Sequence, residues 1–227
     1  MIRNVKLILL MLALMPLCAF AQNGWNDALY KQIEQNVNEP VFKDKTYDVT
    51  KYGASPKATA AKNQKAINKA IEECSKKGGG KVVVPAGTYN TGAIRLKSNV
   101  NLEIQKDAKL QFVFDKTLYP IVKTRWEGMD CMNYSPCVYA YGEKNIAITG
   151  EGTIDGGGSN ATWWKWCGKD RFGWTPQLEE SQKIGRPLLF KLAEAGTDIE
   201  KRDMKDKGLR PQLINLYNCR SEERRVG

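Results

Sequence analysis

Short stretches of alternating apolar and polar residues dominate the chain after residue 80. Each is three to five residues long, as expected for a strand that buries one of its two faces. Short polar or glycine-containing turns separate many of these stretches. The predicted strands are Lys81–Val84, Ala93–Leu96, Val100–Ile104, Leu110–Phe114, Val138–Tyr141, Asn145–Thr149 and Gly152–Ile154.

Helical periodicity is confined mainly to the region before these strands. Apolar residues at helical spacing predict an amphipathic helix that begins near Asn63, as its N-cap, and stops at the glycines of 78–80. A shorter helix is predicted over residues 25–36. A first strand is predicted over residues 47–54. The apolar positions of the main helix are Ala66, Ile67, Ala70, Ile71 and Cys74.

Many brief strands with frequent corners fit a sandwich, a barrel or a solenoid. Two features favour the solenoid. Hairpin dipeptides are scarce between the strands, and the recurring apolar–x–apolar–x–apolar pattern would let each coil lie on the previous one. The sequence therefore predicts an all-β parallel β-helix, with the early helix capping its first coil.

The pattern changes over residues 162–208, which are aromatic, basic and then densely charged. We interpret this segment as a partly helical insertion, with a helix expected over Pro187–Gly196. Insertions in solenoids gather on one face and often shape a binding groove. A strand pattern resumes over 210–219. Residues 220–227 carry charges and no capping element, so a truncated or non-native tail is expected there.

The first residues have the features of an export signal. Arg3 and Lys6 precede an apolar stretch, and Ala19 and Ala21 suit a signal-peptidase site. The apolar stretch is too short to span a bilayer. We therefore expect a signal peptide over 1–21, a leader over 22–46, one β-helix domain over 47–219 and a periplasmic or secreted protein.

Charge and composition narrow the chemistry. Loss of Arg3 and Lys6 with the signal takes the formal charge from +10 to +8. Outside the cytoplasm this favours an acidic polysaccharide as partner over nucleic acid, although solubility alone would also explain it. The absence of histidine excludes Ser-His triads and the usual zinc sites. After Cys18, five cysteines remain, and Cys131 and Cys137 either bridge or stay free.

Several segments in order resemble the N-terminal half of glycoside hydrolase family 28, the polygalacturonases. The resemblance covers roughly residues 47–219. PAGTY is shared across the wider pectate-lyase-like superfamily, whereas GTIDG followed by tryptophans and an RP strand is more specific. The matching segments are YDVTKYGA, KNQKAINKAIEEC, GGGKVVVPAGTY, GAIRLKSNVNLEI, NIAITGEGTIDGGG with WWKW, and RPQLINLYNC.

The resemblance implies a right-handed parallel β-helix that hydrolyses the α-1,4 bonds of galacturonan with inversion, as a monomer without cofactor or metal. Inversion requires one carboxylic acid and one carboxylate, about 6.5–9.5 Å apart. The family's Asn-Thr-Asp, Asp-Asp, Gly-His-Gly and Arg-Ile-Lys signatures are all absent here. No catalytic residue is assigned, and this chain is expected to be an inactive N-terminal fragment of a hydrolase.

Candidate binding residues are aromatic or basic. Trp163 and Trp164 could stack on sugar rings, while Arg125, Trp126 and Lys165 could meet galacturonate carboxylates. For at least two of the tryptophans at 163, 164 and 166, packing in the protein interior is the competing explanation. For the basic side chains, the competing explanation is that they are solvated surface charges. Asp155, set among glycines, is expected to stabilise a turn rather than to act as an acid.

Two other functions remain open. A polysaccharide lyase on the same fold would need an acidic calcium cluster, which the predicted strands do not show. A non-catalytic polysaccharide-binding protein needs only the groove, and the missing catalytic signatures favour it for this chain.

Overall fold

The computed structural model describes residues 27–36 and 40–219. The expected signal peptide and the 220–227 tail lie outside these residues. Helix α2 (Asp27–Asn36) belongs to the first of two units. Its bounds nearly match those of the leader helix predicted over 25–36. The second unit begins at Pro40 and holds every strand. Within the described residues, no helix is long and apolar enough to cross a membrane.

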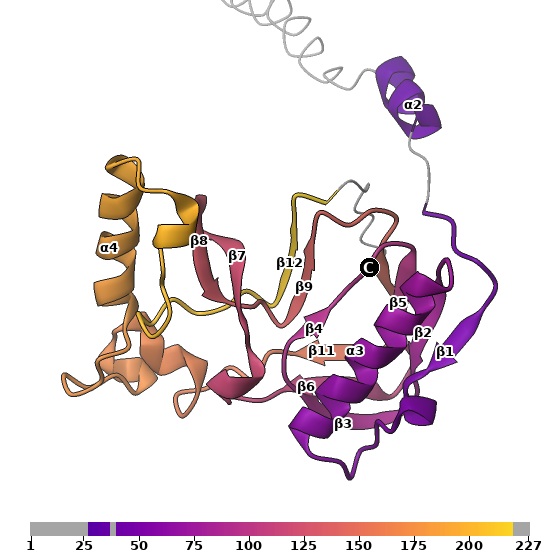
Figure 1. Cartoon of the computed structure of the whole chain (residues 1–227), viewed down its shortest axis with the longest axis horizontal. Helices are drawn as coiled ribbons and strands as arrows, with labels where there is room; N and C mark the ends of the chain where they lie inside the picture. The colour runs from indigo at the N-terminus through magenta and orange to yellow at the C-terminus, as the bar shows by residue number, and fades with distance from the viewer. Residues whose placement is uncertain (1–26, 37–39, 220–227) are drawn as a thin grey trace, which may run out of the picture. The chain divides into compact units, whose positions relative to one another are not determined.

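The second unit is built from three parallel sheets that the chain visits in a repeating order (Figure 1). We name them A, B and C, and we call one strand from each, taken in sequence, a rung. The stacked parallel sheets confirm the predicted rung-on-rung arrangement. Strand β1 (Thr46–Asp48) precedes the first rung and pairs with β2.

The three rungs follow one another along the chain. The first contains β2 (Gly80–Val84), β3 (Gly87–Thr91) and β4 (Ile94–Arg95). The second contains β5 (Val100–Ile104), β6 (Ala108–Phe112) and β9 (Val138–Tyr141). The third contains β10 (Ala147–Thr149), β11 (Thr153–Asp155) and β12 (Ile214–Tyr217).

Inward-facing side chains stack in register between rungs. In sheet A, Val82 pairs with Leu102, and Leu102 with Ile148; in sheet B, Tyr89 pairs with Leu110. Val82 and Leu102 are fully buried. Burial of each such side chain contributes about 1.5–3 kcal/mol to folding. The apolar alternation in the sequence is therefore the inner lining of the coil.

The corners between sheets use residues that accept a left-handed backbone. Asn99 and Asn145 precede equivalent sheet A strands, with φ of 64° and 53°. Their side chains stack, since Asn145 Nδ2 donates to Asn99 Oδ1 at 3.1 Å. Gly150 has φ of 99°, and a Cβ there would lie 2.0 Å from the carbonyl oxygen of Ile104. This corner therefore requires glycine.

Helix α3 (Ala60–Lys76) packs against β1 and the three strands of the first rung. It buries the apolar stripe that the sequence predicts. The predicted N-cap was wrong, because Thr59 caps the helix and Asn63 is buried inside it. Asn63 accepts a hydrogen bond from Ser55 N at 2.8 Å and donates to the carbonyls of Ser55 and Asn90 at 3.0 Å each.

Other predicted boundaries were also wrong. The strand expected over 47–54 ends at Asp48, whose carboxylate caps a 3-10 helix, η2 (Val49–Tyr52). Strand β3 lies where only a turn was expected. The hairpin of β7 (Ile121–Trp126) and β8 (Met129–Tyr134) is antiparallel and was not predicted.

Both long insertions leave the coil at the same corner, between sheet B and sheet C. The first contains η3 (Lys116–Leu118) and the β7–β8 hairpin. The second contains η4 (Trp163–Cys167), η5 (Asp170–Phe172), α4 (Gln182–Glu194) and η6 (Ile199–Lys201). The helix expected over Pro187–Gly196 thus begins earlier, at Gln182, and continues through Pro187.

The two insertions pack on each other and share a small second core. Main-chain hydrogen bonds of 3.0 and 2.8 Å join Met132 to Arg202 and Met204. Figure 1 shows α4 beside the hairpin, away from α3. The core residues are Trp126, Cys131, Leu189, Met204 and Leu209.

The buried amide of Asn63 gives a test of how α3 is attached. We expect Asn63→Ala to lower the free energy of unfolding by about 2–4 kcal/mol, because it leaves buried main-chain groups unpaired. Urea unfolding measures this loss. Lys65→Ala, on the exposed face of the same helix, should change stability by less than about 0.5 kcal/mol. A loss below about 1 kcal/mol for Asn63→Ala would contradict the proposed role of the Asn63 hydrogen bonds in attaching α3.

Candidate functional site

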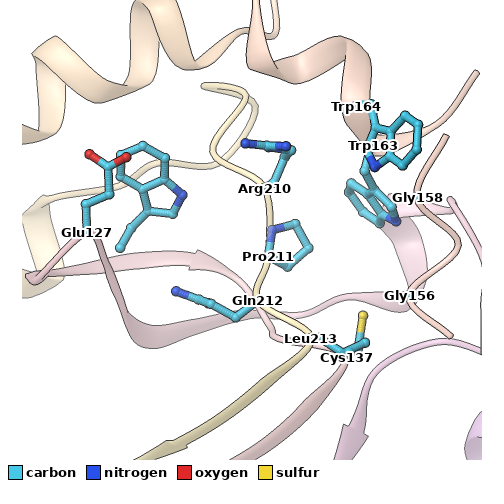
Figure 2. Close-up of a pocket in the computed structure, with 11 residues that line it drawn as sticks. Glu127, Cys137, Gly156, Gly158, Trp163, Trp164, Arg210, Pro211, Gln212 and Leu213 are labelled. Atoms are coloured by element: carbon cyan, nitrogen blue, oxygen red, sulfur yellow. The ribbon is translucent and has the colours of Figure 1, made fainter. Parts of the chain in front are cut away.

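A cavity of about 490 Å³ lies where the insertions meet the starts of the sheet C strands. We call it the corner cavity. Figure 2 shows the 210–213 segment crossing between Glu127 on one side and Trp163 and Trp164 on the other. Its lining includes Trp126, Glu127, Trp163, Trp164, Arg210 and Gln212.

Each wall of the corner cavity comes from a different element. Trp126 and Glu127 lie at the tip of the β7–β8 hairpin. Arg210 and Gln212 lie just before β12. The glycines after β11 allow the chain to turn sharply, and Asp155 stabilises that turn by accepting a hydrogen bond from Gly157 N at 2.8 Å.

Asp155 has the structural role that the sequence indicates. It also forms a 2.6 Å ion pair with Lys109. Hydrogen bonds from Lys109 and then from the Gly157 amide lower the pKa of Asp155 below its usual value. An aspartate with a lowered pKa is ionised at neutral pH and does not serve as a proton donor.

The tryptophans divide into buried and accessible groups. Trp163 and Trp166 are buried, with ring centroids 5.2 Å apart, and Phe114 lies 4.6 Å from Trp163. Packing therefore accounts for two of the three tryptophans, as predicted. Trp164 is 45% exposed and lines the cavity. It rests against Gly158, where a Cβ would lie 2.5 Å from the indole nitrogen of Trp164.

Arg210 is the charge in the corner cavity that lacks an acidic partner among the described residues. Within the described part of the chain, its guanidinium donates only to Gln182 Oε1, at 3.2 Å. Glu127 is already paired with Arg186 at 2.7 Å. An unpaired guanidinium beside an accessible indole suits a sugar that carries a carboxylate.

A second cavity, of about 770 Å³, lies between the β7–β8 hairpin and sheet C. We call it the hairpin cavity. It shares Glu127 and Gln212 with the corner cavity. Its other lining residues include Lys123, Arg125, Asp130, Tyr141, Asn215 and Tyr217.

The structure separates the predicted binding residues. Trp126, Trp163 and Trp164 line the corner cavity, and Trp126 and Trp163 are largely buried. Arg125 lines the hairpin cavity instead. Lys165 lies outside both, with its Nζ 4.9 Å from the centre of the Phe114 ring. Sequence reasoning missed Arg210 as a site residue, although the RP pair before a strand was visible.

Glu127 and Asp130 line the cavities, and each is paired with an arginine, Arg186 and Arg125 respectively. Burial alone would raise the pKa of Asp130, but hydrogen bonds from Arg125 and Tyr217 lower it below its usual value. Cys137 lines the corner cavity, and burial raises the pKa of its thiol to about 12, so it is not a thiolate at neutral pH. Cys74, Cys131, Cys137 and Cys167 are free thiols.

The described residues contain no cluster of three or more acidic, cysteine or histidine side chains that could hold a metal ion. The fold and the site together define stacked parallel sheets with an aromatic-walled cleft at one corner.

Comparisons with known proteins find relatives that match part of this chain. A probable polygalacturonase of Vitis vinifera is 34% identical over 112 residues, 45% of this chain and 22% of that protein. The exo-poly-α-D-galacturonosidase of Dickeya chrysanthemi is 33% identical over 148 residues, 60% of this chain and 23% of that protein. No protein-family profile matches the chain.

A solved structure agrees with these relatives. The crystal structure of a hyperthermoactive exopolygalacturonase from Thermotoga maritima matches with a TM-score of 0.76 and 39% identity, covering 83% of this chain and 43% of that one. The resemblance to family 28 polygalacturonases is confirmed. The chain spans less than half the length of each of these proteins.

Lys116 joins the first insertion to the second. Its ammonium contacts the carboxylates of Glu180 and of Asp206, the latter at 2.8 Å. The Tyr134 hydroxyl donates to the same Asp206 oxygen at 2.6 Å. Hydrogen bonds from Lys116 and then Tyr134 lower the pKa of Asp206 from 3.8 to about 2. This network fixes the insertion that forms one wall of the corner cavity.

The lowered pKa of Asp206 predicts a pH-dependent contribution to stability. The contribution is complete above pH 4 and is lost as the pH falls to about 2. Because Asp206 is 45% exposed, we expect Asp206→Asn to lower the free energy of unfolding by less than about 1 kcal/mol at pH 6. Denaturant unfolding should show this difference vanishing near pH 2.

The matched control is Asp170→Asn, since Asp170 is exposed and makes no ion pair among the described residues. It should show no such pH-dependent difference. If the free energies of unfolding of wild type and Asp206→Asn differ by the same amount at pH 6 and pH 2, the result would count against the network.

Proposed function

We propose that this chain binds the acidic polysaccharide galacturonan in the corner cavity, as the N-terminal part of an exported polygalacturonase. The observation that carries the proposal is Arg210, whose guanidinium has no acidic partner in residues 27–36 and 40–219 and which lines a cavity with the accessible indole of Trp164. The guanidinium would hold a galacturonate carboxylate, and the indole would cover the apolar face of a sugar ring.

The architecture supports the same proposal. We infer that the three sheets form the right-handed parallel β-helix implied by the sequence resemblance, with α3 capping the first rung. The relatives are named for polygalacturonase and galacturonosidase activity. We extend that substrate class to this chain. We also propose export, on the N-terminal pattern of Arg3, Lys6, an apolar stretch and Ala19–Ala21.

We further propose that the complete protein hydrolyses galacturonan with inversion, whereas this chain alone only binds it. Inversion needs a protonated acid on one side of the scissile bond. The carboxylates that line the two cavities, Glu127 and Asp130, are both held in ion pairs with arginine. This pairing favours binding without turnover over hydrolysis by the chain itself.

Binding should depend on the guanidinium of Arg210. We expect Arg210→Gln to weaken binding of an oligogalacturonide about 10- to 100-fold, as for loss of a hydrogen bond to a charged group. Trp164→Ala should weaken it as well. Isothermal titration calorimetry at low salt measures both effects.

The matched control is Lys169→Gln, which removes an exposed positive charge of the second insertion that does not line the corner cavity. It should leave the affinity within about twofold. A methyl-esterified oligomer should bind the wild type as weakly as the acidic oligomer binds Arg210→Gln. Equal affinity of the wild type for both oligomers would refute carboxylate recognition.

Turnover is tested separately. We expect this chain to release no reducing ends from polygalacturonate above a heat-denatured sample, because neither cavity supplies a proton donor. A reducing-sugar assay over several hours measures this. Release of reducing ends that Glu127→Gln abolishes would show that the chain is itself a hydrolase.

A further inference from the structure

We propose that the hairpin cavity binds a neutral sugar unit attached to the acidic chain in the corner cavity. This inference rests on the proposed function and extends it from plain galacturonan to a branched polymer. It is carried by the side chains of the hairpin cavity, whose charges and hydrogen-bonding groups differ from those of the corner cavity.

The floor of the hairpin cavity is aromatic. Tyr141 and Tyr217 are register partners on β9 and β12, and their side chains project from the outer face of sheet C. Their ring centroids lie 5.4 Å apart, with 36° between the ring planes. Both rings are half-buried, and the Arg125 guanidinium lies over the Tyr217 ring, 5.5 Å from its centre. The Tyr141 ring is therefore the apolar surface offered to a sugar ring.

The charges of the hairpin cavity are already paired. Arg125 holds Asp130 at 2.8 Å, and Lys123 faces Glu200 at 3.7 Å. Glu127 is held by Arg186. A galacturonate carboxylate entering this cavity would have to compete with an existing carboxylate for a cation. A carboxylate that binds Arg210 in the corner cavity would face no such competition.

The remaining polar groups of the hairpin cavity favour hydroxyl groups. The side-chain nitrogens of Gln212 and Asn215 each donate one hydrogen bond, to the Arg125 carbonyl and to Thr124 Oγ1. Their amide oxygens accept no side-chain hydrogen bond among the described residues and remain as acceptors. A sugar hydroxyl can donate to such an oxygen, whereas an ionised carboxylate has no proton to donate.

Two further groups complete this set. The Tyr141 hydroxyl and the Asn218 amide line or border the cavity and form no hydrogen bond within the described part of the chain. Both can donate and accept. Because Glu127 and Gln212 line both cavities, a branch on a chain in the corner cavity can enter the hairpin cavity.

The test compares two ligands of equal backbone length by calorimetry: an unbranched oligogalacturonide and one that carries xylosyl branches. We expect the wild type to bind the branched ligand about tenfold more tightly. Tyr141→Ala and Asn218→Gly should abolish this preference and leave affinity for the unbranched ligand unchanged. Glycine is chosen at 218 because Asn218 has a φ of 52°.

Arg210→Gln is the complementary variant, and it should weaken binding of both ligands. Equal binding of the two ligands by the wild type would overturn the neutral-sugar site while leaving the proposed function intact. Equal weakening of both ligands by Tyr141→Ala and Asn218→Gly would overturn it too. Binding of neither ligand by the wild type would overturn the proposed function, and this inference with it.

Discussion

In-register stacking of parallel strands is the constraint on which the rest of the molecule depends. Each rung satisfies its main-chain hydrogen bonds with the rungs beside it, so every strand must keep its alignment with its predecessor. The columns that begin at Val82 and Tyr89 bury the same inner surface rung after rung. The stacked pair Asn99 and Asn145 repeats the same corner geometry.

This constraint also decides where variation is tolerated. An insertion inside a strand would break the register of all neighbouring rungs, whereas one at a corner leaves the ladders intact. Both long insertions occupy the corner between sheets B and C, and they stabilise each other through a core that includes Leu189 and Met204. The cleft therefore lies at that corner because the coil admits extra chain there and supports it from two consecutive rungs.

Sequence periodicity predicted the repeating elements of the fold, whereas the elements that do not repeat were missed. Alternation revealed β5 and β9, and helical spacing revealed the apolar face of α3, since each depends on local periodicity. The β7–β8 hairpin went unpredicted because its pairing is antiparallel and its partner surface is the second insertion. Asn63 was taken for a cap because sequence does not show that its amide meets Asn90, 27 positions away.

The same distinction applies to the candidate site. Trp164 was identifiable as one of the tryptophans that follow the glycines of 156–158, but its exposure beside buried Trp163 is a tertiary property. The pairing of each arginine is also a tertiary property. Arg125 forms an ion pair with Asp130 across the hairpin, whereas Arg210 contacts only an amide among the described residues. Counting charges along the chain therefore cannot find the carboxylate-binding group, because pairing in space determines which charge remains available to a ligand.

The coil and its insertions contribute different chemistry to the cleft. The residues that begin the sheet C strands include Cys137 and Leu213, and they give the cavity an inert, apolar floor. The charged and aromatic groups, Glu127, Trp164 and Arg210, come from the insertions or from the point where one rejoins the coil. Any further rung stacked on β12 would place its own corner side chains beside Gln212. Recognition and bond cleavage can thus be supplied by different rungs of one continuous cleft.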